Sequence, residues 1–313
     1  RGKMAAPLAC LGKAIRRKTG FLSAFLARRP CMDHDKQAQF SVSSAASSSG
    51  ARYENARGAT AGVCQVNGAD IHYQKVGYGN HTVLLLPGAL GCSHTDFSTQ
   101  LDTMNRDLFT LIAWDPRGYG KSSAHERDWP DHFLERDAHD AARLMTNLSY
   151  QKYSLMGWSD GGITAMILAA RYPEVVRKMV VWGSNAFVTA DDMKIFEGVR
   201  DIDKWSERMR KSFVDVYGEP YFRKHWSLWV DAFGKYLKDR DGDICKEDLQ
   251  KITCPTLIVH GQKDPMVMQF HADYLRNNIQ GARLVNMADG KHNLHLKYFR
   301  EFNSTVESFL LEP

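Results

Sequence analysis

The sequence predicts an α/β protein with a mostly parallel, doubly wound sheet and an inserted helical cap. Apolar runs of strand length alternate with helical segments along most of the chain, as in parallel strands joined by helices. One stretch, residues 187–252, breaks this alternation, because it has many aromatic side chains and no strand-like run. The length of 313 residues and the hydrophobic content of 43% suit one large globular domain with such an insertion.

The amino-terminal half of the expected domain contains strands and helices in a readable order. Residues 63–77 alternate apolar and polar side chains and turn at Asn67-Gly68, which indicates a hairpin. Continuous apolar runs, typical of buried strands, cover 82–88 and 108–115. We then expect a helix over 133–148, a strand over 153–157 and a helix over 161–173 that ends before Pro173.

The alternation resumes in the carboxyl-terminal half, on either side of residues 187–252. We expect strands over 177–184, 255–261 and 282–287, a helix over 270–279 and a closing helix over 293–311. The aromatic residues of the insertion are Trp205, Phe213, Tyr217, Tyr221, Phe222, Trp226, Trp229, Phe233 and Tyr236. So much aromatic surface must be buried, and a helical cap over the strand ends would bury it. An ordinary pair of core helices is the alternative.

The segment Gly157-Trp158-Ser159-Asp160-Gly161 matches the pattern G-x-S-x-G. It lies between an expected strand and an expected helix, which is the context that this pattern needs. The serine of such a turn sits on a sharp, strained corner, and larger residues in place of the glycines would collide with the neighbouring strand and helix. We therefore predict Ser159 as a catalytic nucleophile.

A serine nucleophile needs a base, and the base needs an orienting acid. Asp264 follows the strand 255–261, and His292 precedes the closing helix, so both lie in loops at strand ends where α/β sites form. Other candidates fit less well. His295 falls inside the expected helix, His260 inside a strand, and Asp289 only three residues before the base.

Two backbone N–H groups should stabilise the oxyanion that forms during acyl transfer. One is the N–H of Asp160, directly after the nucleophile. The other we assign to Ala89 in "PGALG", the turn that follows the strand 82–88, because small residues let the backbone approach a ligand. A plain tight turn is the alternative for this segment.

Together, "LLLPGALG", "AWDPRGYGKS", "GWSDGG", "IVHGQKDP" and "GKHNLHL" resemble the α/β-hydrolase fold family. The resemblance is closest to its biphenyl hydrolase-like (valacyclovir hydrolase) branch and covers about residues 63–312. It implies a serine hydrolase of α-amino acid esters, including nucleoside-analogue prodrugs, in mitochondria. By position, Ser159, Asp264 and His292 match the family's triad, and Asp160 matches the acid that binds the substrate's α-ammonium.

Asp160 itself has two explanations. A carboxylate in the first turn of a helix gains ~0.3–1 kcal/mol from the helix dipole. An ionised carboxylate about 6 Å from the oxyanion would repel it by roughly 3 kcal/mol at an effective dielectric constant near 20. An ammonium group on the substrate would reverse that effect. We therefore expect Asp160 to select α-amino acid esters over simple esters.

Three other functions remain as alternatives. A generic esterase would share the triad. A hydrolase of carbon–carbon bonds would favour an uncharged residue after the serine, so Asp160 argues against it. A non-enzymatic binding protein on the same scaffold would tend to lose members of the triad, and all three candidates are present.

The composition of the sequence indicates which kinds of binding partner to expect. No run of 18 apolar residues appears, so we expect no membrane span. Residues 1–62 contain 11 Lys and Arg and 3 Asp and Glu. The remaining 30 basic and 33 acidic residues give residues 63–313 a net charge of −3. This charge does not favour binding to nucleic acid. No metal-ligand spacing, paired CxxC or nucleotide-binding glycine motif appears, so we expect neither a metal nor a cofactor. A covered sheet suits a monomer.

Residues 1–62 have the composition of a mitochondrial transit segment. The first acid is Asp33, and bases such as Arg16, Arg17 and Arg28 alternate with apolar residues ahead of a Ser- and Ala-rich run. The alternative is a disordered basic tail that carries no targeting signal.

We predict that residues 1–62, fused to a fluorescent reporter, enter mitochondria because they are Arg-rich and poor in acids. Fluorescence microscopy against a matrix marker measures this. The same segment with its arginines replaced by glutamine is the control, and a diffuse cytosolic signal from the unaltered fusion would contradict the localisation.

Overall fold

The computed structural model describes residues 53–54 and 59–313. Most of the expected transit segment, residues 1–52 and 55–58, lies outside this range. The sheet nevertheless begins ahead of the boundary that we placed at residue 63, because strand β2 (Ala59–Val66) pairs along its whole length with β3 (Ala69–Val76). The small residues at the start of β2 gave no alternating pattern. Gly62 packs against the ring of Tyr73, where a Cβ would lie 2.7 Å from the hydroxyl.

Within the described residues the strands form one nine-stranded sheet in the order β1-β2-β3-β5-β4-β6-β7-β8-β9. The remaining strands are β1 (Tyr53–Glu54), β4 (His81–Leu86), β5 (Phe109–Trp114), β6 (Tyr153–Trp158), β7 (Val176–Trp182), β8 (Thr256–Gly261) and β9 (Arg283–Met287). The pairs β1–β2, β2–β3 and β3–β5 are antiparallel. The other strand pairs are parallel. The predicted α/β fold with a mostly parallel sheet is confirmed.

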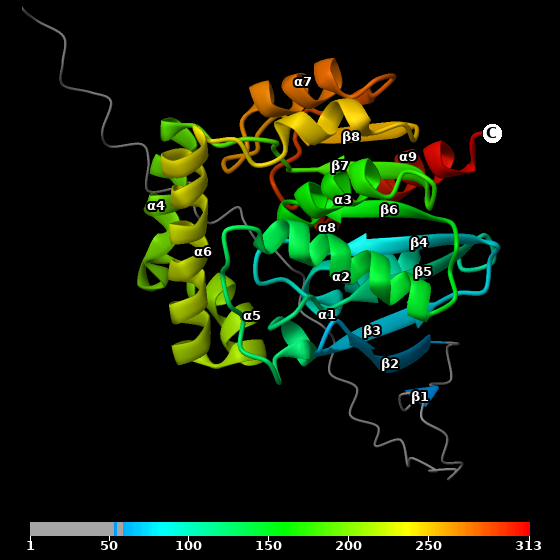
Figure 1. The fold of residues 1–313 in the computed structure, drawn as a ribbon, viewed down its shortest axis with the longest axis horizontal. Helices are drawn as coiled ribbons and strands as arrows, with labels where there is room; N and C mark the ends of the chain where they lie inside the picture. The colour runs from blue at the N-terminus through cyan, green and yellow to red at the C-terminus, as the bar shows by residue number, and fades with distance from the viewer. Residues whose placement is uncertain (1–52, 55–58) are drawn as a thin grey trace, which may run out of the picture.

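Helices cover both faces of this sheet (Figure 1). They are α1 (Ser93–Thr103), α2 (Phe133–Asn147), α3 (Asp160–Arg171), α7 (Gln269–Asn278), α8 (Leu294–Lys297) and α9 (Phe299–Leu311). Successive residues of β4 point to opposite faces. Leu84 and Leu86 join the cluster under α2 and α3, and Val83 and Leu85 join the cluster under α1 and α9. Burial on both faces explains why residues 83–86 of this strand are all apolar.

The cap lies between β7 and β8, as expected for residues 187–252. It consists of α4 (Ala190–Arg200), α5 (Glu207–Tyr217) and α6 (Glu219–Arg240), with the short turns η3 (Ile202–Lys204) and η4 (Lys246–Lys251). These three helices stand at the left of Figure 1, over the ends of the parallel strands. The aromatic side chains of the cap pack on one another. Phe213 and Phe222, for example, stack with ring centres 4.7 Å apart.

Two helices differ from the expectation. The helix α1 was missed, because only Phe97 and Leu101 give it an apolar stripe among polar residues. The closing helix expected over 293–311 is divided at Tyr298 into α8 and α9. The side chain of Gln100 donates to the carbonyl oxygen of His295 at 2.7 Å, which takes the place of the next intrahelical hydrogen bond.

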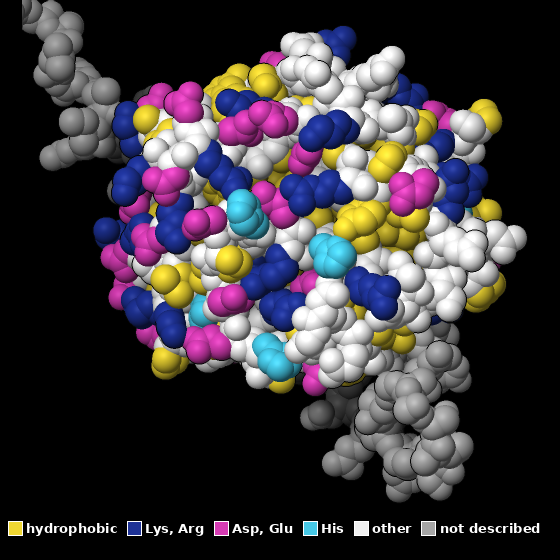
Figure 2. Space-filling view, viewed as in Figure 1, with side chains coloured by type: hydrophobic (Ala, Val, Ile, Leu, Met, Phe, Trp, Pro, Cys, Tyr) yellow, Lys and Arg dark blue, Asp and Glu magenta, His cyan; other side chains and the backbone are white. Residues whose placement is uncertain are grey.

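The surface over the cap mixes charges of both signs. Figure 2 shows basic and acidic side chains interspersed over the cap helices. Many of them are paired, such as Arg200 with Glu197 and Asp231, and Arg223 with Asp203. Of the helices that the structure describes, none has the length and apolarity that a bilayer crossing requires.

Candidate active site

Ser159 occupies a strained corner between β6 and α3. Its backbone has φ 55° and ψ −123°, a combination that costs a non-glycine residue about 1–3 kcal/mol and persists only where the surroundings hold it. The glycines on either side make the corner possible. A Cβ on Gly157 would lie 2.4 Å from the carbonyl oxygen of Gly161, and a Cβ on Gly161 would lie 2.0 Å from that of Leu86. The structure thus explains why the motif needs both glycines.

The structure brings Ser159, His292 and Asp264 together from three loops. The Nε2 atom of His292 lies 3.1 Å from the Ser159 hydroxyl, and its Nδ1 lies 2.9 Å from Oδ2 of Asp264. The other oxygen of Asp264 accepts the N–H groups of Met266 and Val267 at 2.8 and 3.1 Å. A carboxylate held in this way accepts the Nδ1 proton, which leaves Nε2 to accept the serine proton.

The competing residues occupy other positions. His295 is fully buried, with Nδ1 accepting from Trp182 at 3.0 Å and Nε2 3.1 Å from the carbonyl oxygen of Asp96. Both nitrogens of its ring are thus engaged, one with strand β7 and one with helix α1. His260 lies within β8 and is buried. Asp289 is exposed and paired with Lys263. None of the three approaches Ser159 as His292 does.

The turn after β4 lies against the nucleophile. A Cβ on Gly88 would be 3.3 Å from that of Ser159, so the backbone passes directly beside the serine. The N–H of Gly91 donates to the carbonyl oxygen of Gly88 at 2.9 Å, and Asp96 accepts the N–H of Gly88 at 3.0 Å. Leu90 has φ 51°, a value that suits glycine better than leucine. The turn is therefore strained and held by specific contacts.

Both predicted oxyanion donors lie beside Ser159. Ala89 lines the same pocket as Ser159 and Asp160. Asp160 is the first residue of α3, and N–H groups in the first turn of a helix have no acceptor within the helix. Both residues that we predict as oxyanion donors therefore line one pocket with the nucleophile.

Asp160 is buried and hydrogen-bonded by the cap. It is 7% exposed, and its Oδ2 accepts the indole N–H of Trp229 on α6 at 2.7 Å. Burial raises the pKa of Asp160 to about 7, against the hydrogen bond from Trp229 and the positive charge of Arg127, which lower it. Near pH 7 a substantial fraction of this carboxyl is therefore protonated. The repulsion that we expected between Asp160 and an oxyanion is correspondingly weaker for a simple ester.

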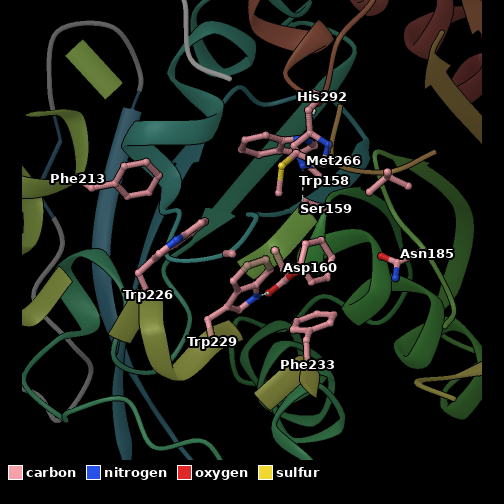
Figure 3. Close-up of a pocket in the computed structure, with 13 residues that line it drawn as sticks. Trp158, Ser159, Asp160, Asn185, Phe213, Trp226, Trp229, Phe233, Met266 and His292 are labelled. Atoms are coloured by element: carbon pink, nitrogen blue, oxygen red, sulfur yellow. Dashed lines mark hydrogen bonds between the residues drawn. The ribbon is translucent and has the colours of Figure 1, made fainter. Parts of the chain in front are cut away.

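Most of the residues that line the pocket around these groups are apolar (Figure 3). The pocket is lined by Ala89, Trp158, Ser159, Asp160, Asn185, Phe196, Phe213, Trp226, Trp229, Phe233, Met266, Val267 and His292. Asp160 is thus a carboxyl group beside the nucleophile in a pocket lined mainly by aromatic and aliphatic side chains. Among the described residues, no group of three His, Cys, Asp or Glu side chains could hold a metal ion.

Sequence reasoning missed several residues of the site. Trp229 was counted only as a cap aromatic, because nothing in the sequence pairs it with Asp160. Arg127 and Asp137 form a buried ion pair with two hydrogen bonds of 2.8 and 2.6 Å, and both influence the charge on Asp160. Asp137 lies in a helix and Arg127 in a polar loop, where such residues are usually exposed.

Comparisons with known proteins agree with the α/β fold described above. Residues 81–215 match the family model described as alpha/beta hydrolase fold. Over 245 residues, 78% of this chain, the sequence is 54% identical to "Serine hydrolase BPHL" of Homo sapiens, of which it covers 84%. The corresponding protein of Mus musculus shares the same identity over the same lengths.

Solved structures resemble the chain in fold. A meta-cleavage product hydrolase from Pseudomonas fluorescens IP01 has a TM-score of 0.65 at 20% identity, over 79% of this chain and 96% of that one. The enol-lactonase from Burkholderia xenovorans LB400 has a TM-score of 0.65 at 21% identity, over 80% of this chain and 100% of that one. At such identities these structures establish the fold alone.

We predict that Asp160→Asn stabilises the protein at pH 8. Because the folded-state pKa of about 7 lies above the ordinary value of 3.8, the wild type loses stability as the pH rises between these values. Asparagine keeps an acceptor for Trp229 and carries no charge. The gain at pH 8 should be on the order of 2–4 kcal/mol and should nearly vanish at pH 4. Chemical denaturation at both pH values measures it, and an equal effect at both would contradict the burial argument.

Proposed function

Because the chain belongs to the α/β-hydrolase family, as a relative of the BPHL serine hydrolases, we propose that it cleaves carboxylic esters of α-amino acids. Such esters include amino acid ester prodrugs of nucleoside analogues, such as valacyclovir. The observation that supports this substrate class is the buried carboxyl of Asp160 beside Ser159 in an apolar pocket. A buried carboxylate is stabilised by a cation, and an α-ammonium group is the cation nearest to an ester carbonyl in such a substrate.

We assign Ser159, His292 and Asp264 the roles of nucleophile, base and orienting acid. The Ser159 oxygen attacks the ester carbonyl carbon as its proton passes to Nε2 of His292, and the imidazolium then returns that proton to the departing alcohol oxygen. In the second half, a water loses a proton to Nε2 as its oxygen bonds to the acyl carbon. The bond between that carbon and the Ser159 oxygen then breaks, and the imidazolium returns the proton to this oxygen, which releases the amino acid and restores Ser159. The N–H groups of Ala89 and Asp160 stabilise the oxyanion in both halves.

Asp160 acts in this scheme through its side chain as well as its backbone. The ammonium of the substrate lies between its carboxylate and the oxyanion, so that it is attracted by both. Trp229 holds the carboxylate in place through Oδ2. A simple ester brings no cation, and it meets a carboxyl that burial keeps partly protonated. The preference therefore comes mainly from attraction of the amine rather than from repulsion of other esters.

The alternative of carbon–carbon bond hydrolysis has less support. The meta-cleavage product hydrolase shares only the fold with this chain. A site for such chemistry would favour an uncharged residue after the nucleophile, and here the buried carboxyl of Asp160 follows Ser159.

We predict that Ser159→Ala and His292→Ala each lower kcat for an amino acid ester by roughly 10³- to 10⁶-fold, because the nucleophile and its base act as a unit. Asp264→Asn should lower kcat less than Ser159→Ala does, since it acts through the histidine. Steady-state kinetics, with circular dichroism to check folding, measures these effects. A folded Ser159→Ala variant with near-normal turnover would disprove the assignment of the nucleophile.

We predict that Asp160→Asn lowers kcat/KM for a valine ester by roughly 10- to 1000-fold, the loss expected for one charge-assisted contact. The 3-methylbutanoate ester of the same alcohol lacks only the amine and is the control. Its kcat/KM should stay constant or rise. If the ratio of the two kcat/KM values did not change, Asp160 would not recognise the amine, and the protein would be a generic esterase.

The same ratio should depend on pH. In the wild type it should rise as the pH rises through about 7, because ionisation of Asp160 creates the amine site. Effects of His292 cancel, since both substrates use the same base. The ratio should fall again near pH 8, where α-amines lose their proton. In Asp160→Asn the rise through pH 7 should be absent.

A further inference from the structure

The cap touches the oxyanion turn through one tyrosine hydroxyl. Tyr217 is the last residue of α5, and its hydroxyl donates to the carbonyl oxygen of Leu90 at 2.8 Å. The same hydroxyl accepts the N–H of Gly120, in the loop after β5, at 2.9 Å. Leu90 belongs to the turn from Gly88 to Gly91 that presents the Ala89 N–H. One side chain of the cap therefore bridges two loops of the core at the edge of the site.

Hydrogen bonds link this hydroxyl to the proposed oxyanion donor through two peptide groups. The carbonyl of Leu90 belongs to the same peptide as the N–H of Gly91, which donates to the carbonyl oxygen of Gly88 at 2.9 Å. The carbonyl of Gly88 in turn belongs to the same peptide as the N–H of Ala89. Each bond fixes the plane of the next peptide, and hydrogen bonds in such a chain polarise one another. The direction of the Ala89 N–H is thus set partly from the cap.

The turn needs this support because it is strained. Leu90 has φ 51°, which leucine rarely adopts, and its side chain is fully buried. Relaxation of Leu90 towards negative φ would reorganise the turn to which Ala89 belongs. Asp96 holds the start of the turn through the N–H of Gly88, and Tyr217 holds its end. Burial raises the pKa of Tyr217 well above its ordinary value, so the hydroxyl keeps the proton that it donates.

We propose that Tyr217 is a positioning residue that holds the oxyanion turn in its catalytic geometry. The cap then takes part in the chemistry of ester cleavage and not only in substrate binding. This inference rests on the proposed roles of Ser159 and Ala89 but not on amine recognition by Asp160. It therefore applies equally to esters with and without an amine.

Tyr221 provides a matched control. It lies four residues after Tyr217, and the two rings stack with centres 5.6 Å apart. Its hydroxyl also makes two backbone hydrogen bonds, donating to the carbonyl oxygen of Gly118 at 2.8 Å and accepting the N–H of Arg127 at 3.1 Å. These bonds hold only the loop after β5. The two tyrosines differ in that only Tyr217 reaches the oxyanion turn.

The experiment compares Tyr217→Phe with Tyr221→Phe in the full chain, with 4-nitrophenyl acetate as the ester. Removal of a whole oxyanion donor costs about 10²- to 10³-fold in rate, so its misalignment in Tyr217→Phe should lower kcat/KM roughly 5- to 50-fold. Tyr221→Phe should stay within about 3-fold of the wild type. Both variants should lose similar thermal stability, because each loses a hydroxyl with two backbone hydrogen bonds.

A boronic acid supplies a second measurement that a purely structural role would not alter. Its adduct with Ser159 is a tetrahedral anion, with an oxygen in the position of the oxyanion. Its inhibition constant should rise in Tyr217→Phe by about the factor by which kcat/KM falls, because both depend on the same N–H groups. In Tyr221→Phe it should change as little as kcat/KM does.

The outcomes separate this inference from the proposed function. Equal losses in the two variants, or a lower kcat/KM in Tyr217→Phe without a weaker boronate, would overturn the role of Tyr217 and leave the serine hydrolase mechanism standing. A wild type that is inert towards esters, or one whose turnover survives in Ser159→Ala, would overturn the proposed function and the inference together.

Discussion

The backbone corner at Ser159 is the constraint on which the rest of the site depends. Its positive φ is possible only because β6 and α3 approach to backbone contact at Gly157 and Gly161. The contact of Gly161 with the carbonyl of Leu86 brings the end of β4 to the same point, and with it the turn that contains Ala89. The corner also makes Asp160 the first residue of a helix beside the nucleophile. One local geometry therefore places Ser159, the turn that contains Ala89, and Asp160 beside one another.

The cap buries the carboxyl of Asp160 and thereby changes its ionisation. Trp226 and Trp229 stack with centres 4.8 Å apart, and with Phe196 and Phe233 they surround Asp160 with aromatic surface. Without that cover, the carboxyl would be an ordinary, solvated acid. With it, ionisation of the carboxyl is unfavourable unless a cation lies beside it, so the free protein holds a destabilised group. Natural proteins commonly accept such a loss of stability at functional sites.

Local patterns in the sequence were enough for the fold and for part of the site. The turn at Asn67-Gly68 adopts the positive φ angles that such a pair favours, and the glycines around Ser159 mark a corner that needs them. Asp264 and His292 could be selected by their places after strands. The hydrogen bonds from Trp229 to Asp160 and from Tyr217 to Leu90 join residues 69 and 127 positions apart. Their partners depend on how the cap folds over the core, which no local pattern encodes.

The order of the site along the chain has a consequence for synthesis. The nucleophile and the oxyanion turn are made early, whereas His292 follows β9, and α8 and α9 pack behind it. During synthesis, Ser159 is therefore added to the chain more than a hundred residues before His292. Until the final segment docks, the Ser159 hydroxyl has no His292 beside it. The candidate site is therefore complete only at the last step of folding, and nascent or unfolded chains lack it.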